Sequence, residues 1–129
     1  MKLFLDTADV DSISDSFLTG LIDGVTTNPT LMMKSGKNPE DVYQDLINLG
    51  VPDISMEVVG DSYEMIQEGL RLFEKFGQQA TIKVPCTPDG LIACRELSRN
   101  LIKVNVTLIF SPSQAILSAK AGATYVSPF

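Results

Sequence analysis

Ala80-Thr81-Ile82-Lys83-Val84-Pro85 is the stretch of sequence on which the fold prediction depends. Its β-branched residues predict a strand, and the proline marks the end of that strand. Side chains alternate between the two faces of a strand, so Ile82 and Val84 share one face and Lys83 lies on the other. A lysine on the inner side of such an apolar strand loses hydration of its charged form, which lowers its pKa and makes a neutral amine available. The alternative is a lysine whose stem packs inside while its charged head reaches water.

The composition is that of one ordinary globular domain, which we expect to span residues 1–129. The net charge is −6 and the ten basic residues are scattered, so we expect neither nucleic acid nor an anionic membrane as a partner. No apolar run approaches transmembrane length and the amino terminus lacks a signal peptide, which predicts a cytoplasmic protein. The two cysteines, Cys86 and Cys94, match no metal-binding or CxxC spacing, and we expect two reduced thiols.

The chain contains no histidine. This absence excludes Ser-His-Asp and Cys-His catalytic pairs, and it makes a catalytic zinc site improbable, so we expect neither a metal nor a cofactor. A neutral lysine amine attacks a ketone or aldehyde to form a Schiff base. Carbonyl chemistry in this chain would therefore use lysine.

Strands and helices are predicted in strict alternation along the chain. The six predicted strands are Lys2–Asp6, Gly24–Thr27, Ile54–Val59, Ala80–Pro85, Val104–Phe110 and Thr124–Ser127. Helices are predicted between them, beginning after Thr7-Ala8-Asp9, at Asn38-Pro39, at Asp61, at Thr87-Pro88 and at Ser111-Pro112. Such alternation predicts a parallel sheet with right-handed crossovers.

Polar residues at the strand ends decide between a doubly wound open sheet and a (β/α)8 TIM barrel. One polar residue lies at or near the carboxyl end of each predicted strand: Asp6, Asn28, Glu57, Lys83, Thr107 and Ser127. An open sheet would place some of these groups under helices, at a high cost for the charged ones. In a barrel they converge on one pocket, and no GxGxxG or P-loop supports the open sheet. We therefore predict an α/β fold of the TIM-barrel type, with about six of its eight βα units readable.

A set of motifs runs in order over the whole chain. They are Leu5-Asp6-Thr7-Ala8, Gly24-Val25-Thr26-Thr27-Asn28-Pro29, Ile82-Lys83-Val84-Pro85, Asn105-Val106-Thr107-Leu108-Ile109-Phe110, Ala121-Gly122-Ala123 and Ser127-Pro128-Phe129. In this order and at these intervals, the chain resembles the transaldolase family, and especially the short subgroup that includes fructose-6-phosphate aldolase. The resemblance implies a barrel of class I aldolase type and a metal-independent reaction through a lysine Schiff base.

The resemblance also implies the catalytic residues. Lys83 matches the Schiff-base lysine, and Asp6 matches the acid–base residue that handles the proton of the donor's hydroxyl. Glu57 and Thr107 match a pair holding a water that shuttles protons. Each has a simpler interpretation: Asp6 as a carboxylate near a helix N-terminus, and Thr107 as an ordinary strand residue. Glu57 could instead be an ion-pair partner of Lys83, which would raise the lysine pKa and oppose the chemistry.

The substrate-binding residues are likewise implied by the resemblance. Asn28 matches a ligand of a substrate hydroxyl, with Thr26 and Thr27 lining the same strand end. Ser127 matches a residue that hydrogen-bonds the substrate, and Phe129 a wall of the pocket. Without the family, Asn28 followed by proline is typical of a turn. We interpret Cys86, which follows the lysine strand, as a packing residue.

Two positions separate the subgroups of the family. Glu57 and Phe129 match transaldolases, whereas the aldolases carry glutamine and tyrosine there. The expected reaction transfers a dihydroxyacetone unit from fructose or sedoheptulose phosphate to an aldose phosphate, in the pentose phosphate pathway. Simple cleavage of fructose 6-phosphate is the alternative within the family.

The family pattern continues past Ser127-Pro128-Phe129 into a segment whose arginine binds the substrate phosphate. We therefore expect the chain to be the amino-terminal part of a transaldolase, with sugar phosphates as substrates and a homo-oligomer at full length. We expect residues 1–129 alone to have little activity. An alternative of another class is an inactive fragment that associates with partner chains.

Overall fold

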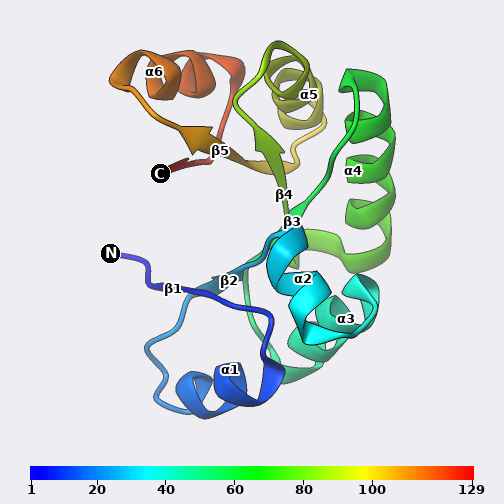
Figure 1. Cartoon of the computed structure of the whole chain (residues 1–129), viewed down its shortest axis with the longest axis vertical. Coiled ribbons are helices and arrows are strands. Elements are labelled where there is room, and N and C mark those ends of the chain that lie inside the picture. Colours follow the sequence, from blue (N-terminus) through cyan, green and yellow to red (C-terminus); the bar gives the residue numbers. More distant parts are fainter. The chain divides into compact units, whose positions relative to one another are not determined.

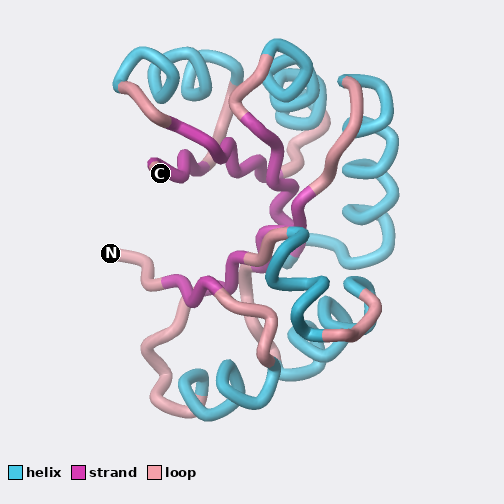
Figure 2. Tube along the Cα trace, viewed as in Figure 1, coloured by secondary structure: helices cyan, strands magenta, loops and turns pink.

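The computed structural model describes all residues, 1–129. Strands and helices alternate along the chain, as Figures 1 and 2 show. The chain divides into two compact units, residues 1–56 and residues 57–129, and each is described in turn.

All strand pairings are parallel, and the strand order follows the chain order. The strands are β1 (Phe4–Asp6), β2 (Gly24–Thr26), β3 (Ile54–Glu57), β4 (Ala80–Pro85), β5 (Lys103–Ile109) and β6 (Tyr125–Pro128). All six predicted strands are present, with ends that differ by up to two residues. This singly wound βα repeat is that of an incomplete (β/α)8 barrel, which confirms the predicted fold class.

Six α-helices connect the strands: α1 (Val10–Phe17), α2 (Pro29–Ser35), α3 (Pro39–Leu49), α4 (Ser62–Phe76), α5 (Pro88–Arg99) and α6 (Pro112–Ala121). A short 3₁₀ turn, Gly77–Gln79, precedes β4. Helix α2 was not predicted, because Asn28-Pro29 was interpreted as a turn. None of the helices is long and apolar enough to cross a membrane.

Four of the helices begin in the same way. In α2, α3, α5 and α6 the residue before the helix caps it with a side-chain oxygen, and proline occupies the first helical position. The capping oxygen accepts one of the backbone N–H groups that the first turn leaves unpaired. Proline fits the next position because it has no N–H to satisfy and its φ is already helical. Helix α4 instead uses a capping box between Asp61 and Glu64.

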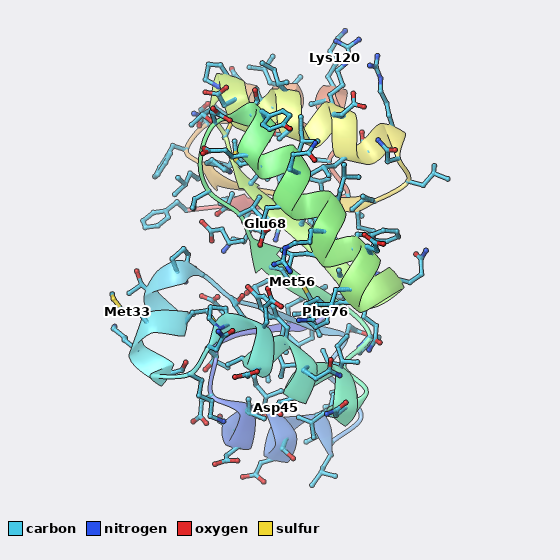
Figure 3. All side chains as sticks on the ribbon, turned by 90° about the vertical axis from the view of Figure 1, so that its right-hand side faces the viewer. Met33, Asp45, Met56, Glu68, Phe76 and Lys120 are labelled. Atoms are coloured by element: carbon cyan, nitrogen blue, oxygen red, sulfur yellow. The ribbon has the colours of Figure 1, made fainter.

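The core of the first unit joins its strands to α1 and α3. Val25 of β2, Ile54 of β3, Ile13 of α1 and Leu46 of α3 are completely buried, and α1 contacts α3 directly. At the outer surface of this unit, Met33 projects from α2 into solvent (Figure 3). The apolar residues therefore hold the helices against one face of the strands.

In the second unit, α4, α5 and α6 lie on one side of the strands (Figure 1). Ile82 of β4 faces them, since a Cβ built on Gly69 of α4 would lie 3.2 Å from the Ile82 side chain and 2.9 Å from Leu97 of α5. Cys94 of α5 is completely buried in this layer, and burial raises the pKa of its thiol to about 11. Because side chains alternate along a strand, Lys83 points to the face of β4 away from these helices.

Strand β5 contains an irregularity near its end. Its pairing with β6 passes from Val106 opposite Val126 to Ile109 opposite Pro128, so β5 has one extra residue in this interval. Leu108 lies in the left-handed region, with φ of 59°. This conformation costs a residue with a Cβ about 1–2 kcal/mol, so the surrounding structure must hold it in place.

Candidate active site

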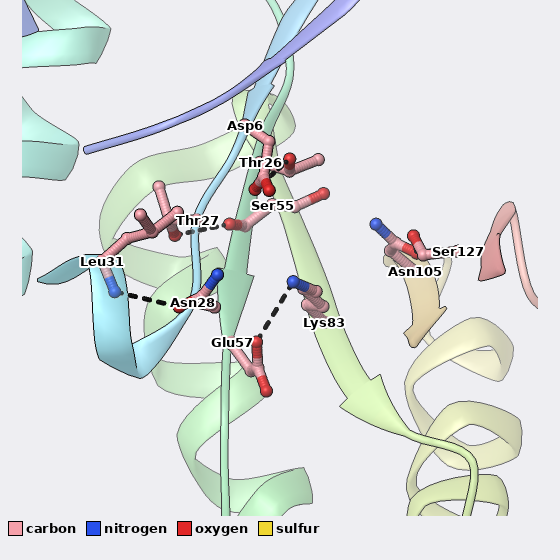
Figure 4. Close-up of polar contacts among 10 residues, drawn as sticks. All are labelled: Asp6, Thr26, Thr27, Asn28, Leu31, Ser55, Glu57, Lys83, Asn105 and Ser127. Carbon is pink, nitrogen blue, oxygen red and sulfur yellow. Dashed lines mark hydrogen bonds and ion pairs between the residues drawn. The ribbon is translucent and has the colours of Figure 1, made fainter. Parts of the chain in front are cut away.

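Lys83 is buried on β4 and faces a carboxylate. The residue is 7% exposed, and its Nζ lies 3.2 Å from Oε2 of Glu57, the last residue of β3 (Figure 4). The backbone joins the same two segments, because the N–H of Val58 donates to the Lys83 carbonyl at 3.0 Å. The strand alternation predicted this inward lysine, and the contact is the direct ion pair that was the alternative interpretation of Glu57.

The ion pair has two chemical consequences. Glu57 is the counter-ion of a buried ammonium, which would be costly to bury without one. It is also a base within reach of the lysine proton, so it can accept that proton before the amine reacts. The same contact therefore contributes to stability and provides a path for proton transfer.

Asn105 of β5 extends this polar cluster, although it was not among the predicted site residues. It lies directly opposite Lys83 in the β4–β5 register and is 2% exposed. The Ser127 hydroxyl of β6 donates to the Asn105 Oδ1 at 2.8 Å (Figure 4). Ser127 was predicted to bind substrate. In the structure its hydroxyl orients the Asn105 side-chain amide, with the Oδ1 toward Ser127 and the NH2 group away from Ser127. Asn105 is two positions before Thr107, so the two residues share the face of β5 that lies beside Lys83. This spacing was the signal in the sequence that could have identified Asn105.

Thr107 lies one pleat further along β5, opposite Pro85 at the end of β4. Its backbone carbonyl accepts the Cys86 N–H at 2.9 Å, and the residue is 9% exposed. Its hydroxyl has no hydrogen-bond partner within the chain and is available to a bound water or a substrate. We call Glu57, Lys83, Asn105, Thr107 and Ser127 the Lys83 cluster.

Phe129 lies beside Phe110 at the start of α6. The two ring centroids are 5.3 Å apart with a tilt of 39°, and both residues line a cavity of about 310 Å³ with Ile109, Pro112 and Ala115. Phe129 is 92% exposed. Phe129 therefore forms part of the apolar wall of the cavity beside α6.

In the first unit, three polar residues lie side by side on neighbouring strands. Asp6 of β1 is opposite Thr26 of β2, and Thr26 is opposite Ser55 of β3. The Thr26 hydroxyl donates to the Asp6 Oδ1 at 2.9 Å (Figure 4). Asp6 is exposed to solvent, whereas Ser55 is buried. We call these three residues the Asp6 row.

Thr27 and Asn28 have local structural partners. Thr27 is completely buried, and its hydroxyl donates to the Ser55 carbonyl at 2.9 Å, so it faces away from the Asp6 row. Asn28 caps α2, because its Oδ1 accepts the Leu31 N–H at 2.9 Å (Figure 4). The Asn28 amide nitrogen has no partner within the chain, so it can still donate a hydrogen bond to a ligand.

The remaining reactive groups lie apart from this chemistry. Cys86 has its Sγ 3.8 Å from the Ser118 hydroxyl of α6, and both cysteines are free thiols. No group of three or more acidic, cysteine or histidine side chains is placed to hold a metal ion. The titratable side chains that remain for carbonyl chemistry are the lysine and the carboxylates described above.

Comparisons with known proteins agree on one family. The family model described as transaldolase/fructose-6-phosphate aldolase matches residues 3–129. Relatives named probable transaldolase include those of Nitrosopumilus maritimus (52% identical), Anaeromyxobacter sp. (55%) and Thermodesulfovibrio yellowstonii (50%). Each alignment covers 100% of this chain and 58 to 60% of the relative. The chain therefore spans about three fifths of the length of these curated relatives.

Proposed function

The chain belongs to the transaldolase/fructose-6-phosphate aldolase family, and from that membership we propose that Lys83 is the Schiff-base lysine of a transaldolase. The observation that carries the proposal is a buried lysine whose Nζ faces the Glu57 carboxylate, on the face of β4 away from α4 and α5. The reaction transfers a dihydroxyacetone unit from a ketose phosphate to an aldose phosphate. We place it in the cytoplasmic pentose phosphate pathway.

The first stage joins the lysine to the donor. Glu57 takes a proton from the Lys83 ammonium, and the neutral amine attacks the ketone carbon to form a carbinolamine. Protonation of the carbinolamine hydroxyl, through Glu57 and a water held by Thr107, releases one molecule of water and leaves an iminium ion. The direct ion pair favours the charged lysine and to that extent opposes attack, as the alternative interpretation of Glu57 implied. The same contact gives the proton one short path to Glu57 and back, which supports the proposed role.

The second stage breaks and remakes a carbon–carbon bond. Asp6 takes the proton of the hydroxyl on the carbon that is β to the iminium carbon, and the bond between the α and β carbons breaks. The O–H electron pair becomes the aldehyde C=O bond, the pair of the broken bond becomes the enamine C=C bond, and the iminium π pair moves to the nitrogen. The aldehyde leaves and an enamine remains. The enamine carbon then attacks the acceptor aldehyde, Asp6 returns the proton to the new alkoxide, and water frees the product from Lys83. The hydrogen bond from Thr26 would hold the Asp6 carboxylate in one orientation for both transfers.

Transfer and simple cleavage differ only in the fate of the enamine. Glu57 and Phe129 support transfer, because they match the transaldolases of the family rather than the aldolases. We expect Glu57→Gln to shift the balance toward cleavage of fructose 6-phosphate, or to impair both reactions. The comparison is made in a protein of the relatives' length. If Glu57→Gln has the same transfer rate and the same cleavage rate as the wild type, the transaldolase assignment is contradicted and the aldolase alternative remains.

The decisive experiment is reductive trapping. Borohydride added with dihydroxyacetone or fructose 6-phosphate should convert the imine at Lys83 to a stable secondary amine, which peptide mass spectrometry locates. Lys83→Met should abolish the adduct, while Lys34→Met, which removes an exposed lysine of α2, should not. An adduct on another lysine, or none at all in the wild type at the relatives' length, would refute the proposal.

A second candidate, association with partner chains, is favoured by the apolar surface of the second unit. Ile116 and Leu117 of α6 are exposed, as are Phe110 and Phe129. Sedimentation of residues 1–129 over a range of concentrations tests this candidate. A single monomeric species with trapping and transfer rates equal to those of the longer protein would exclude it.

A further inference from the structure

Leu108 has a backbone conformation that its residue type does not favour. It is one of two non-glycine residues with positive φ, at 59°, and the other is Leu101, at 61°. Leucine has no local preference for this region, in contrast to glycine, asparagine and aspartate. The conformation at Leu108 must therefore be imposed by the structure on either side of it.

Leu108 belongs to a β-bulge at the end of β5. Between the pairs Val106–Val126 and Ile109–Pro128, β5 has two residues and β6 has only Ser127. Bulges of this kind usually occur between antiparallel strands, and they are frequent at barrel rims and beside active sites. Here the bulge lies between parallel strands, directly after Thr107.

The bulge changes which face of the strand each residue occupies. Thr107 shares the face of Lys83, and regular alternation would place Ile109 on that face too. Instead Ile109 is buried and lines the apolar cavity with Pro112 and Ala115 of α6. Its carbonyl also accepts the Phe129 N–H at 2.9 Å. One left-handed residue therefore lets β5 hold Thr107 on the reactive face and Ile109 under α6.

We propose that Leu108 is a positioning residue for Thr107. Its left-handed backbone fixes the Thr107 hydroxyl on the Lys83 face while Ile109 anchors the strand end under α6. The catalytic part of this inference rests on the proposed function, because it gives Thr107 a role in proton transfer. The structural part, that the bulge holds the strand end, does not.

The variants separate backbone conformation from side-chain contacts. L108N removes the leucine side chain but tolerates positive φ, whereas L108V keeps an apolar side chain whose β-branch makes positive φ an outlier. L101N and L101V are matched controls, since Leu101 has nearly the same φ but lies before β5, at the end opposite Thr107. Each pair changes the same residue type in the same conformation.

Two readouts are measured on all four variants. The first is amide hydrogen exchange of Phe129 and Cys86, whose N–H groups bond to the carbonyls of Ile109 and Thr107. The second is the rate of borohydride trapping at Lys83 with dihydroxyacetone. For L108V we expect faster exchange at both amides and a rate lower by about 10- to 100-fold, since a misplacement of about 1 Å costs about that much. L108N and both Leu101 variants should stay close to the wild-type rate.

The outcomes distinguish the inference from the proposed function. Wild-type exchange and wild-type trapping in L108V would overturn the inference, as would an equal loss of trapping in L101V. Slow trapping in L108N as well as L108V would assign the effect to the leucine side chain and also overturn it. If the wild type forms no adduct, the proposed function fails, and exchange in L108V against L101V still decides whether the bulge holds the strand end.

Discussion

The charged residue of the candidate site is held differently in the two units. In the second unit, Lys83 and Asn105 are buried and each has a fixed side-chain partner, Glu57 for the first and Ser127 for the second. In the first unit, Asp6 is exposed, with a hydroxyl donor beside it. A buried amine is shielded from water, whereas an exposed carboxylate keeps most of its hydration.

This difference indicates which substitutions should affect both the reaction and the stability of the fold. Removing one member of a buried ion pair leaves the other charge without compensation, so changes in the Lys83 cluster should affect folding as well as reaction. Changes at the exposed Asp6 should affect reaction with little effect on folding. The following predictions test this contrast, beginning with the largest expected effect.

Glu57→Gln should lower both stability and reactivity. The change removes the carboxylate that faces the buried Lys83 ammonium at 3.2 Å, and we expect a loss of about 3 kcal/mol in the free energy of unfolding. Loss of the base should slow trapping at Lys83 by about 10²-fold or more. Asp6→Asn, by contrast, should change the free energy of unfolding by less than about 0.5 kcal/mol while it reduces transfer in a protein of the relatives' length.

Urea unfolding and the trapping rate measure these effects. Glu68→Gln on α4 is the control, because it removes a partly exposed glutamate paired with Arg71 at 2.7 Å. The contrast between the units breaks down if Asp6→Asn destabilises the chain as much as Glu57→Gln does.

The buried thiol of Cys94 sharpens the contrast through pH. Its pKa is raised from 9.0 to about 11 in the folded chain, so between these values the unfolded thiol loses its proton while the folded one keeps it. Unfolding then releases a proton, and stability falls as the pH rises through this window. The contribution is about 2 to 3 kcal/mol between pH 9 and pH 11.

Urea unfolding of the wild type and Cys94→Ala, near pH 8 and near pH 11, isolates this contribution. All other groups are the same in the two proteins, so only the difference between the two slopes belongs to Cys94. Parallel pH profiles for the two proteins would show that this helical layer does not exclude water from the thiol.

Thr26→Val should have a moderate effect, confined to the first unit. It removes the hydroxyl that donates to Asp6 while keeping the shape of the side chain. We expect a loss of about 1 kcal/mol in the free energy of unfolding and slower transfer in a protein of the relatives' length. Thr26→Ser, which keeps the donor, should restore most of the rate; equal transfer rates in Thr26→Val and Thr26→Ser would remove Thr26 from the proposed mechanism.

Leu101→Gly should have the smallest effect and the opposite sign. Glycine relieves a left-handed conformation that costs leucine about 1–2 kcal/mol, and it adds about 0.5–1 kcal/mol of unfolded-state entropy. The chain should therefore gain about 0.5–1 kcal/mol in the free energy of unfolding, seen as a higher urea midpoint. A lower midpoint would mean that the exposed Leu101 side chain stabilises the second unit in some other way.

The sequence predicted the strands and the inward lysine because their signals are local. Apolar and β-branched residues alternate with Lys83 over six positions, and four of the helices (α3, α4, α5 and α6) begin where a capping residue was recognised. Helix α2 was missed although Asn28-Pro29 has the same pattern as Asn38-Pro39, which was interpreted correctly. The first pair follows a strand directly, and there a turn and a helix start share one sequence.

The site could be predicted less completely, because its contacts depend on register. Asn105 becomes part of the Lys83 cluster only when β4 and β5 pair as they do, and its orientation depends on Ser127 of a third strand. The direct contact of Glu57 with Lys83 was one of two open interpretations. No property of leucine predicts positive φ, so the bulge at Leu108 follows from tertiary structure alone.

The shared start of α2, α3, α5 and α6 has a consequence for how such chains change over evolutionary time. Each of these helices carries its start signal in two adjacent residues, with no contribution from a distant segment. A strand-and-helix segment cut from this chain therefore retains the instruction that begins its helix. Duplication or recombination at such boundaries would transplant working modules, and a new neighbour would have to fit both the strand faces and the adjacent helix.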